Sequence, residues 1–140
     1  MPGAQIASRP VEGFDYVHEE PVRFRDIDAM GHVNNAVFLT YIESARSAFF
    51  WHLGIARSLE DLTLVVARVE IDFRAPVGPG GEVEISVHAS RFGEKSFDLD
   101  YVLRVGGKIV AEARSVLVGY DYGTGETIAI PEDWRERMAA

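Results

Sequence analysis

The chain has 140 residues, 47% hydrophobic and 26% charged, which is typical of a soluble globular protein able to bury a core. Its formal net charge of -8 disfavours nucleic acid and anionic membranes as partners, because both attract basic surfaces. The lack of cysteine excludes disulfides, thiolate metal sites and cysteine nucleophiles. No signal peptide is evident, and no stretch approaches the roughly 20 apolar residues of a membrane span, so we expect a cytoplasmic protein.

The first part of the chain mixes Pro, Gly, Ser and Arg without a period. This composition predicts a flexible leader over residues 1–13, followed by a single domain over residues 14–140. We expect ordered structure from about Tyr16. Alternating residues from Pro21 to Asp28 predict a short strand that breaks where the acidic residues arrive, which places Asp28 at a strand end or just beyond it.

A long amphipathic helix is predicted from Ala36 to Leu53, because its apolar residues recur at a period near 3.6. The preceding segment, Gly31–Asn35, has the composition of a turn, and either Asn34 or Asn35 could cap the helix. Gly54 is expected to end it.

Two aromatic residues of this helix, Phe50 and Trp51, lie off the main apolar stripe. Bulky aromatics near a solvent face indicate a subunit contact more often than idle exposure. The helix therefore favours an oligomer.

Four strands are predicted after the helix, over residues 62–75, 82–92, 96–105 and 108–122. Gly106 and Gly107 are a two-residue hairpin signal, so the sheet should be largely antiparallel. Pro131 could open a short C-terminal helix. This order predicts an α+β fold with one helix packed on a curved sheet, and because one helix covers only one face, we expect a dimer.

Several catalytic chemistries are disfavoured by the motifs. The four His residues have no second ligand at metal spacing, and the chain carries no serine-hydrolase elbow, Walker loop or dinucleotide fingerprint. The remaining candidate is the carboxylate of Asp28, close to a helix N-terminus whose free N–H groups could bind an oxyanion. This pair suits attack on a thioester, because a thiol with a pKa of about 8.5 leaves without a strong general acid.

The segments Arg25–Phe38 and Tyr41–Arg46 resemble the signature of the 4-hydroxybenzoyl-CoA thioesterase family of hotdog proteins. The resemblance extends through Phe73–Val77 and Gly93–Phe97 and covers about residues 16–122. It implies the hotdog fold, in which a curved antiparallel sheet wraps around one long central helix. It also implies homodimers that often pair into homotetramers.

The resemblance implies an acyl-CoA thioesterase with no cofactor and no metal. Asp28 matches the family's catalytic carboxylate, as base or nucleophile, and Asp26 matches its supporting partner. Asn35 matches the residue whose backbone N–H polarises the thioester carbonyl. Glu43 matches a position where an acid often faces the substrate pocket, and one branch of the family places its catalytic Glu on this helix.

Substrate-binding residues are implied in two places. Those around the turn and the helix start are Gly31, His32, Val33, Asn34 and Phe38. Lys95 and Ser96 match a hairpin loop that meets the phosphates of coenzyme A, and Arg91 is a nearby basic candidate.

Two positions depart from the hydroxybenzoyl-specific enzymes, which tend to carry Pro where Ala29 stands and an aromatic residue where Asn35 stands. The general acyl-CoA branch is a better match. Two alternatives remain: a hotdog hydratase that uses His32, and a non-catalytic module that binds or senses acyl-CoA or an acyl carrier. Acyl chain length, coenzyme A versus acyl carrier protein, and dimer versus tetramer stay open.

Overall fold

The structure is a computed structural model, and it describes residues 9–55 and 63–139. The elements in chain order are β1 (Tyr16–Pro21), the short 3-10 helix η1 (Phe24–Asp26), α1 (Asn35–Leu53), β2 (Leu64–Phe73), β3 (Glu82–Phe92), β4 (Ser96–Val105), β5 (Lys108–Asp121), β6 (Glu126–Thr127) and α2 (Glu132–Ala139).

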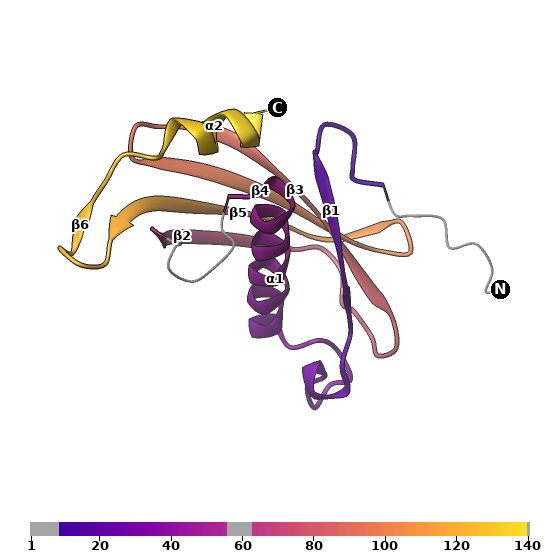
Figure 1. Ribbon diagram of the computed structural model, residues 1–140. Helices are drawn as coiled ribbons and strands as arrows, with labels where there is room; N and C mark the ends of the chain where they lie inside the picture. The colour runs from indigo at the N-terminus through magenta and orange to yellow at the C-terminus, as the bar shows by residue number, and fades with distance from the viewer. Residues whose placement is uncertain (1–8, 56–62, 140) are drawn as a thin grey trace.

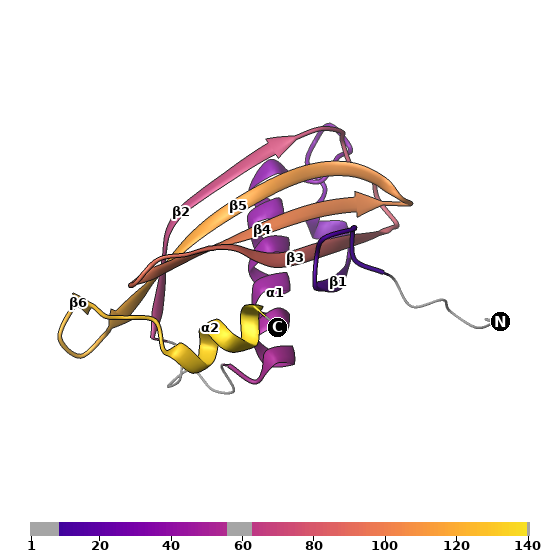
Figure 2. The ribbon, with the colours of Figure 1, turned by 90° about the horizontal axis from the view of Figure 1, so that it is seen from above.

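The strands form one antiparallel sheet in the order β1-β3-β4-β5-β2, and β6 pairs with the end of β5. The sheet curves around α1, which lies against its concave face, while α2 lies near the C-terminal end of α1 (Figures 1 and 2). The α+β prediction of one long helix wrapped by a curved antiparallel sheet is confirmed.

The core lies between α1 and the concave face of the sheet, because alternate strand residues point toward the helix. The buried side chains of α1 are Phe38, Tyr41, Ile42, Ala45, Phe49 and Phe50. Facing them are Val83, Ile85, Val87, Phe97, Leu99, Tyr101, Leu103 and Leu117. Burying each large apolar side chain stabilises the fold by about 1.5–3 kcal/mol, so the stripe and the sheet hold each other in place.

Two turn predictions are confirmed. Gly106 and Gly107 connect β4 to β5 with φ of 58° and 82°, as a hairpin turn with two left-handed residues requires. Gly54 ends α1 with φ of 72°, and its N–H donates to the carbonyls of Phe50 and Trp51.

The predicted strand over Pro21–Asp28 is wrong. The first strand ends at Pro21, and residues Phe24–Asp26 form a 3-10 turn instead. The Asp26 carboxylate accepts the N–H of Arg23 at 2.8 Å, and this bond folds the chain back where an extended strand was expected.

The expected exposure of Phe50 is also wrong, because the curved sheet covers a wider stripe of the helix than its periodicity indicates. The Phe50 side chain is 4% exposed, and its ring meets that of Phe97 at 6.2 Å. Trp51 is 66% exposed, and a subunit contact there stays a prediction.

The described part of the expected leader contacts the outer face of the sheet. Val11 donates its N–H to the Ser86 hydroxyl at 3.0 Å, and Arg104 donates to the carbonyl of Arg9. The remainder of the leader lies outside the described residues. Among the helices of residues 9–55 and 63–139, none is long and apolar enough to cross a membrane.

Candidate active site

A tight turn between η1 and α1 carries Asp28. Ile27 and Val33 form an isolated antiparallel bridge, and Asp28 donates its N–H to the carbonyl of His32 at 2.8 Å. Gly31 closes the turn with φ of 82°, a conformation that favours glycine, and its N–H donates to the carbonyl of Asp28. The turn therefore has a defined shape, although most of it is exposed.

The Asp28 carboxylate is half-buried and is bonded on one side. Its Oδ1 accepts the N–H of Met30 at 2.9 Å and the N–H of His32 at 3.4 Å. Within the described residues, Oδ2 has no hydrogen-bond donor, so this oxygen is available to water or a substrate. Asp28 is held in one orientation while half of its carboxylate stays open.

The start of α1 leaves one backbone donor open. The Asn34 side chain caps the helix by accepting the N–H of Ala36 at 2.9 Å, and Val37 donates to the carbonyl of Asn34. The N–H of Asn35, the first helical residue, has no acceptor in the described part of the chain. It lies at the positive end of the helix dipole, where an oxyanion is stabilised.

Asp28 and Asn35 line the same cavity, whose volume is about 290 Å³. The other lining residues are Met30, His32, Val33, Phe38, Phe73, Arg74, Ala75 and Pro76. Most of them are apolar, and the rings of Phe38 and Phe73 meet edge to face at 5.2 Å. The cavity therefore combines a carboxylate, an open N–H and an apolar wall. Gly31 and Asn34 are not among the lining residues, but they shape the turn and the helix cap beside the cavity.

Asp26 has a different environment from Asp28. It is 7% exposed, and its Oδ2 accepts both the Arg23 N–H at 2.8 Å and the Tyr41 hydroxyl at 2.7 Å. Burial alone would raise the pKa of Asp26, but the hydrogen bonds from Arg23 and Tyr41 lower it below its usual value. Burial and the bond to Asp26 raise the pKa of Tyr41. The sequence prediction of a supporting role for Asp26 did not include Tyr41, although a phenol on a buried helix stripe signals a polar partner.

Glu43 lies away from this cavity. It is eight residues beyond Asn35, or about 12 Å along the helix axis. It lines a second cavity of about 200 Å³ between α1 and β2, together with Arg46, Ser47, Phe50 and residues of β2 and β5. Its side chain is exposed. Within one subunit the structure does not bring Glu43 to Asp28.

The predicted coenzyme A residues lie at the other end of the molecule, on the β3–β4 hairpin near the C-terminal end of α1 (Figure 1). The 19 residues of α1 span about 28 Å, so Lys95 and Ser96 are remote from Asp28 of the same subunit. Lys95 is exposed. The Arg91 guanidinium donates to the Ser96 hydroxyl at 3.0 Å and to the Asp98 carboxylate at 2.9 Å. The ion pair with Asp98 partly neutralises the charge of Arg91.

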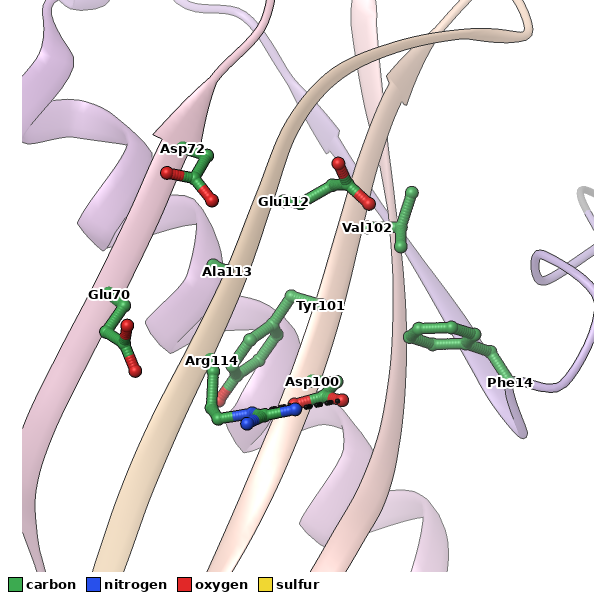
Figure 3. Close-up of a pocket in the computed structure, with 9 residues that line it drawn as sticks. All are labelled: Phe14, Glu70, Asp72, Asp100, Tyr101, Val102, Glu112, Ala113 and Arg114. Carbon is green, nitrogen blue, oxygen red and sulfur yellow. Dashed lines mark hydrogen bonds and ion pairs between the residues drawn. The ribbon is translucent and has the colours of Figure 1, made fainter.

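A third cavity, of about 280 Å³, lies on the face of the sheet that turns away from α1 (Figure 3). Arg114 and Asp100 form an ion pair across it at 2.7 Å. Glu70, Asp72 and Glu112 add negative charge. The sheet separates this cavity from Asp28, and no residue of the turn lines it.

The chain matches the family model described as the thioesterase-like superfamily over residues 22–138. It belongs to that superfamily. This thioesterase resembles the 1,4-dihydroxy-2-naphthoyl-CoA hydrolase of Synechococcus elongatus, with 31% identity over 133 residues that cover 89% of this chain and 98% of the relative. It is 27% identical to the long-chain acyl-CoA thioesterase FadM of Escherichia coli, over 84% of this chain and 92% of that one.

Among solved structures, the thioesterase is similar to one from Thermus thermophilus that was crystallised with coenzyme A and zinc. The TM-score is 0.83 and the identity 39%, over 91% of this chain and 94% of that one. The predicted hotdog fold and thioesterase class are confirmed. Within the described residues, no group of three or more His, Cys, Asp or Glu side chains could hold a metal ion such as that zinc.

Proposed function

We propose that this protein hydrolyses acyl-CoA to a free acid and coenzyme A, with Asp28 as the catalytic carboxylate and the N–H of Asn35 as the oxyanion donor. The observation that carries this proposal is that Asp28 and the open end of α1 line one apolar cavity. The open Oδ2 activates a water molecule or attacks the carbonyl carbon itself.

The reaction needs little more than these two groups. Attack on the thioester carbonyl places negative charge on its oxygen, and a fixed backbone donor at a helix N-terminus stabilises that charge. The leaving thiol has a pKa of about 8.5, so the thiolate departs without a general acid. His32 lines the same cavity, but this reaction does not need its side chain. Its backbone holds the turn, because its carbonyl accepts the N–H of Asp28 and its N–H donates to Oδ1 of Asp28.

The cavity wall favours an apolar acyl group. Met30, Val33, Phe38 and Phe73 supply aliphatic and aromatic surface beside Asp28. Among the relatives, one acts on an aromatic naphthoyl-CoA and another on long-chain acyl-CoA, and both types suit such a wall. An acyl group of either class is therefore within the proposal.

We also infer that a second copy of the chain covers β2. This strand is one of the two edges of the sheet, opposite β1. Val69 and Phe73 point to the α1 side of the sheet but are 36% and 46% exposed, and the contact of Phe73 with Phe38 of α1 covers only part of its ring. Val65 and Val66 are also exposed, and an exposed apolar edge strand readily pairs with another chain. The further pairing of dimers into a tetramer stays a prediction.

Antiparallel pairing of two β2 strands about a two-fold axis would explain why the expected site residues are apart within one subunit. Such an axis reverses the direction of the partner's α1, so the partner's β3–β4 hairpin would lie toward this subunit's Asp28. Lys95, Ser96 and Arg91 would then contact the phosphates of a coenzyme A whose thioester lies at Asp28 of the other subunit. Lys95 and Arg91 would supply the local positive charge that an anionic ligand needs on an acidic protein.

The deciding experiment is a thiol-release assay of Asp28→Asn against short-chain, long-chain and aromatic acyl-CoAs. Because a general base or nucleophile contributes on the order of 10²–10⁴ to the rate, we expect kcat to fall at least about 100-fold while the melting temperature is kept. The matched control is Asp133→Asn, which alters an exposed carboxylate of α2 paired with Arg137 and should keep full turnover. Turnover by Asp28→Asn near that of the parent protein would refute the assignment.

A further inference from the structure

Tyr41 is a buried polar residue in the middle of the apolar face of α1. Its side chain is 0% exposed, and its ring packs against Phe38 with a centroid distance of 6.0 Å. Its hydroxyl donates to Oδ2 of Asp26 at 2.7 Å. A phenylalanine would fill the same volume, so packing alone does not require the hydroxyl.

Asp26 connects this hydroxyl to both ends of the turn that carries Asp28. Its carboxylate accepts the N–H of Arg23 at 2.8 Å, at the point where the chain leaves β1. Its main-chain carbonyl accepts the N–H of Asn34, the cap of α1, at 2.9 Å. Asp26 therefore joins the start of the turn, the cap of α1 and, through Tyr41, the body of α1.

These bonds fix the distance between the two groups that the proposed reaction uses. Asp28 is two residues after Asp26, and Asn35 is one residue after Asn34, so the Asp26–Asn34 contact sets where the carboxylate lies relative to the open N–H. Asp26 is 7% exposed, and a buried carboxylate that loses a donor must shift or take up water. Removing the Tyr41 hydroxyl should therefore move Asp26 and, with it, the start of α1.

We propose that Tyr41 is a positioning residue for thioester hydrolysis, which acts through Asp26 to hold the N-terminus of α1 against the Asp28 turn. This inference rests on the proposed function. Tyr41 does not line the cavity, so it affects the reaction through geometry and without contact with the substrate.

The primary test is Tyr41→Phe, assayed with the best acyl-CoA substrate of the protein. Misplacement of reacting groups by as little as 1 Å can slow a reaction by about 100-fold, so we expect kcat to fall at least about tenfold. The KM should stay within about twofold, because the cavity wall is unchanged. Hydrogen exchange at the amide of Asn34 should become faster.

The matched control is Tyr101→Phe, since Tyr101 is also a buried phenol, 1% exposed, whose hydroxyl bonds to Ser115 at 2.7 Å. This bond lies between β4 and β5, away from the Asp28 turn. Tyr41→Phe loses the bond to Asp26, and Tyr101→Phe loses the bond to Ser115 and a longer one from Arg46 at 3.3 Å, so both variants should melt at a lower temperature than the parent protein. Only Tyr41→Phe should lose kcat at a temperature where both are fully folded.

Two variants of Asp26 give a second, independent measure. Asp26→Asn keeps an oxygen that accepts from Tyr41 and Arg23, and its kcat should stay within about threefold of the parent value. Asp26→Ala should match Tyr41→Phe, and combining Asp26→Ala with Tyr41→Phe should reduce kcat no further, because residues of one network are not additive.

A parental kcat in Tyr41→Phe, or an equal loss of kcat in Tyr101→Phe, would overturn the positioning role. The two proposals fail in different ways. Full turnover by Asp28→Asn refutes the catalytic carboxylate, whereas full turnover by Tyr41→Phe beside an inactive Asp28→Asn refutes the positioning role alone.

Discussion

At the scale of single residues, Asp26 and Asp28 are two positions apart and have opposite surroundings. Asp26 is buried, and its carboxylate is bonded to Tyr41 and Arg23. Asp28 is half-buried, accepts backbone N–H groups on Oδ1 alone within residues 9–55 and 63–139, and borders a cavity. A buried carboxylate bonded to two donors of the fold supports structure, whereas an oriented carboxylate that borders a cavity suits catalysis. The spacing of the two acids does not distinguish them, but their burial does.

The lowered pKa of Asp26 predicts how stability depends on pH. Its folded pKa lies below its unfolded value near 4, so its ionised form stabilises the fold above about pH 4, and that contribution is lost as the pH falls through the folded pKa. Asp26→Asn lacks this titration. We therefore expect the free energy of unfolding of the parent protein to exceed that of Asp26→Asn at pH 7, and the difference to shrink toward pH 3. Urea denaturation at several pH values measures it, and a constant difference would contradict the prediction.

At the scale of elements, α2 connects the β3–β4 hairpin to the C-terminal end of α1. Arg135 donates to the carbonyls of Gly93 and Glu94, the latter at 2.8 Å. Arg137 donates to the carbonyl of Leu53 at 2.8 Å, where a cation is favourable at the end of the helix dipole. The hairpin loop is therefore held by a helix that follows it by about 40 residues in the chain.

This contact predicts a role for Arg135 in coenzyme A binding. Arg135→Gln should loosen the loop that carries Lys95 and raise the KM for an acyl-CoA several-fold. The KM for the matching acyl-pantetheine, which lacks the nucleotide phosphates, should not change. Arg137→Gln, a change of the same type on the same helix, serves as the control and should leave both KM values unaltered. An equal rise in KM for both substrates would show that the loop does not bind the phosphates.

At the scale of the whole molecule, the sheet has two edge strands, β1 and β2, and they differ in the side chains that they expose. The β1 edge lies next to the turn that leads into α1, whereas β2 leaves apolar side chains such as Val69 and Phe73 in solvent. Exposed edges of this kind are normally covered in the native assembly.

The exposed edge predicts that Val69→Arg shifts the protein from dimer to monomer. A buried charge at the centre of β2 would oppose the same charge on the partner across the two-fold axis. Turnover should fall with the dimer, because the cavity beside Phe73 loses the partner's β3–β4 hairpin, which is proposed to bind coenzyme A. Thr127→Arg places the same charge on the exposed strand β6 and should change neither property. Sedimentation velocity measures the assembly, and a dimeric, active Val69→Arg would refute the interface.

The local features of this protein follow from its sequence alone. The 3.6 period of residues 36–53, the alternation of the later strands and the Gly106–Gly107 turn depend on neighbouring residues, and each is confirmed in the structure. The resemblance around Asp28 also indicated the superfamily and the thioesterase class, which the family match confirms. The roles of the site residues stay predictions.

Which of these residues meet depends on the tertiary structure. The Asp26–Tyr41 bond and the contact of Arg135 with the β3–β4 hairpin join segments that no local period relates. The length of α1 separates Lys95 from Asp28, although both belong to the same expected site. The path of the chain between Pro21 and Asp28 also depends on a side chain. The Asp26 carboxylate accepts the N–H of Arg23, which in a continued strand would donate to a neighbouring strand. Periodicity reports which face of an element is buried, whereas a site is set by the distances between elements, and these arise only when the whole core packs.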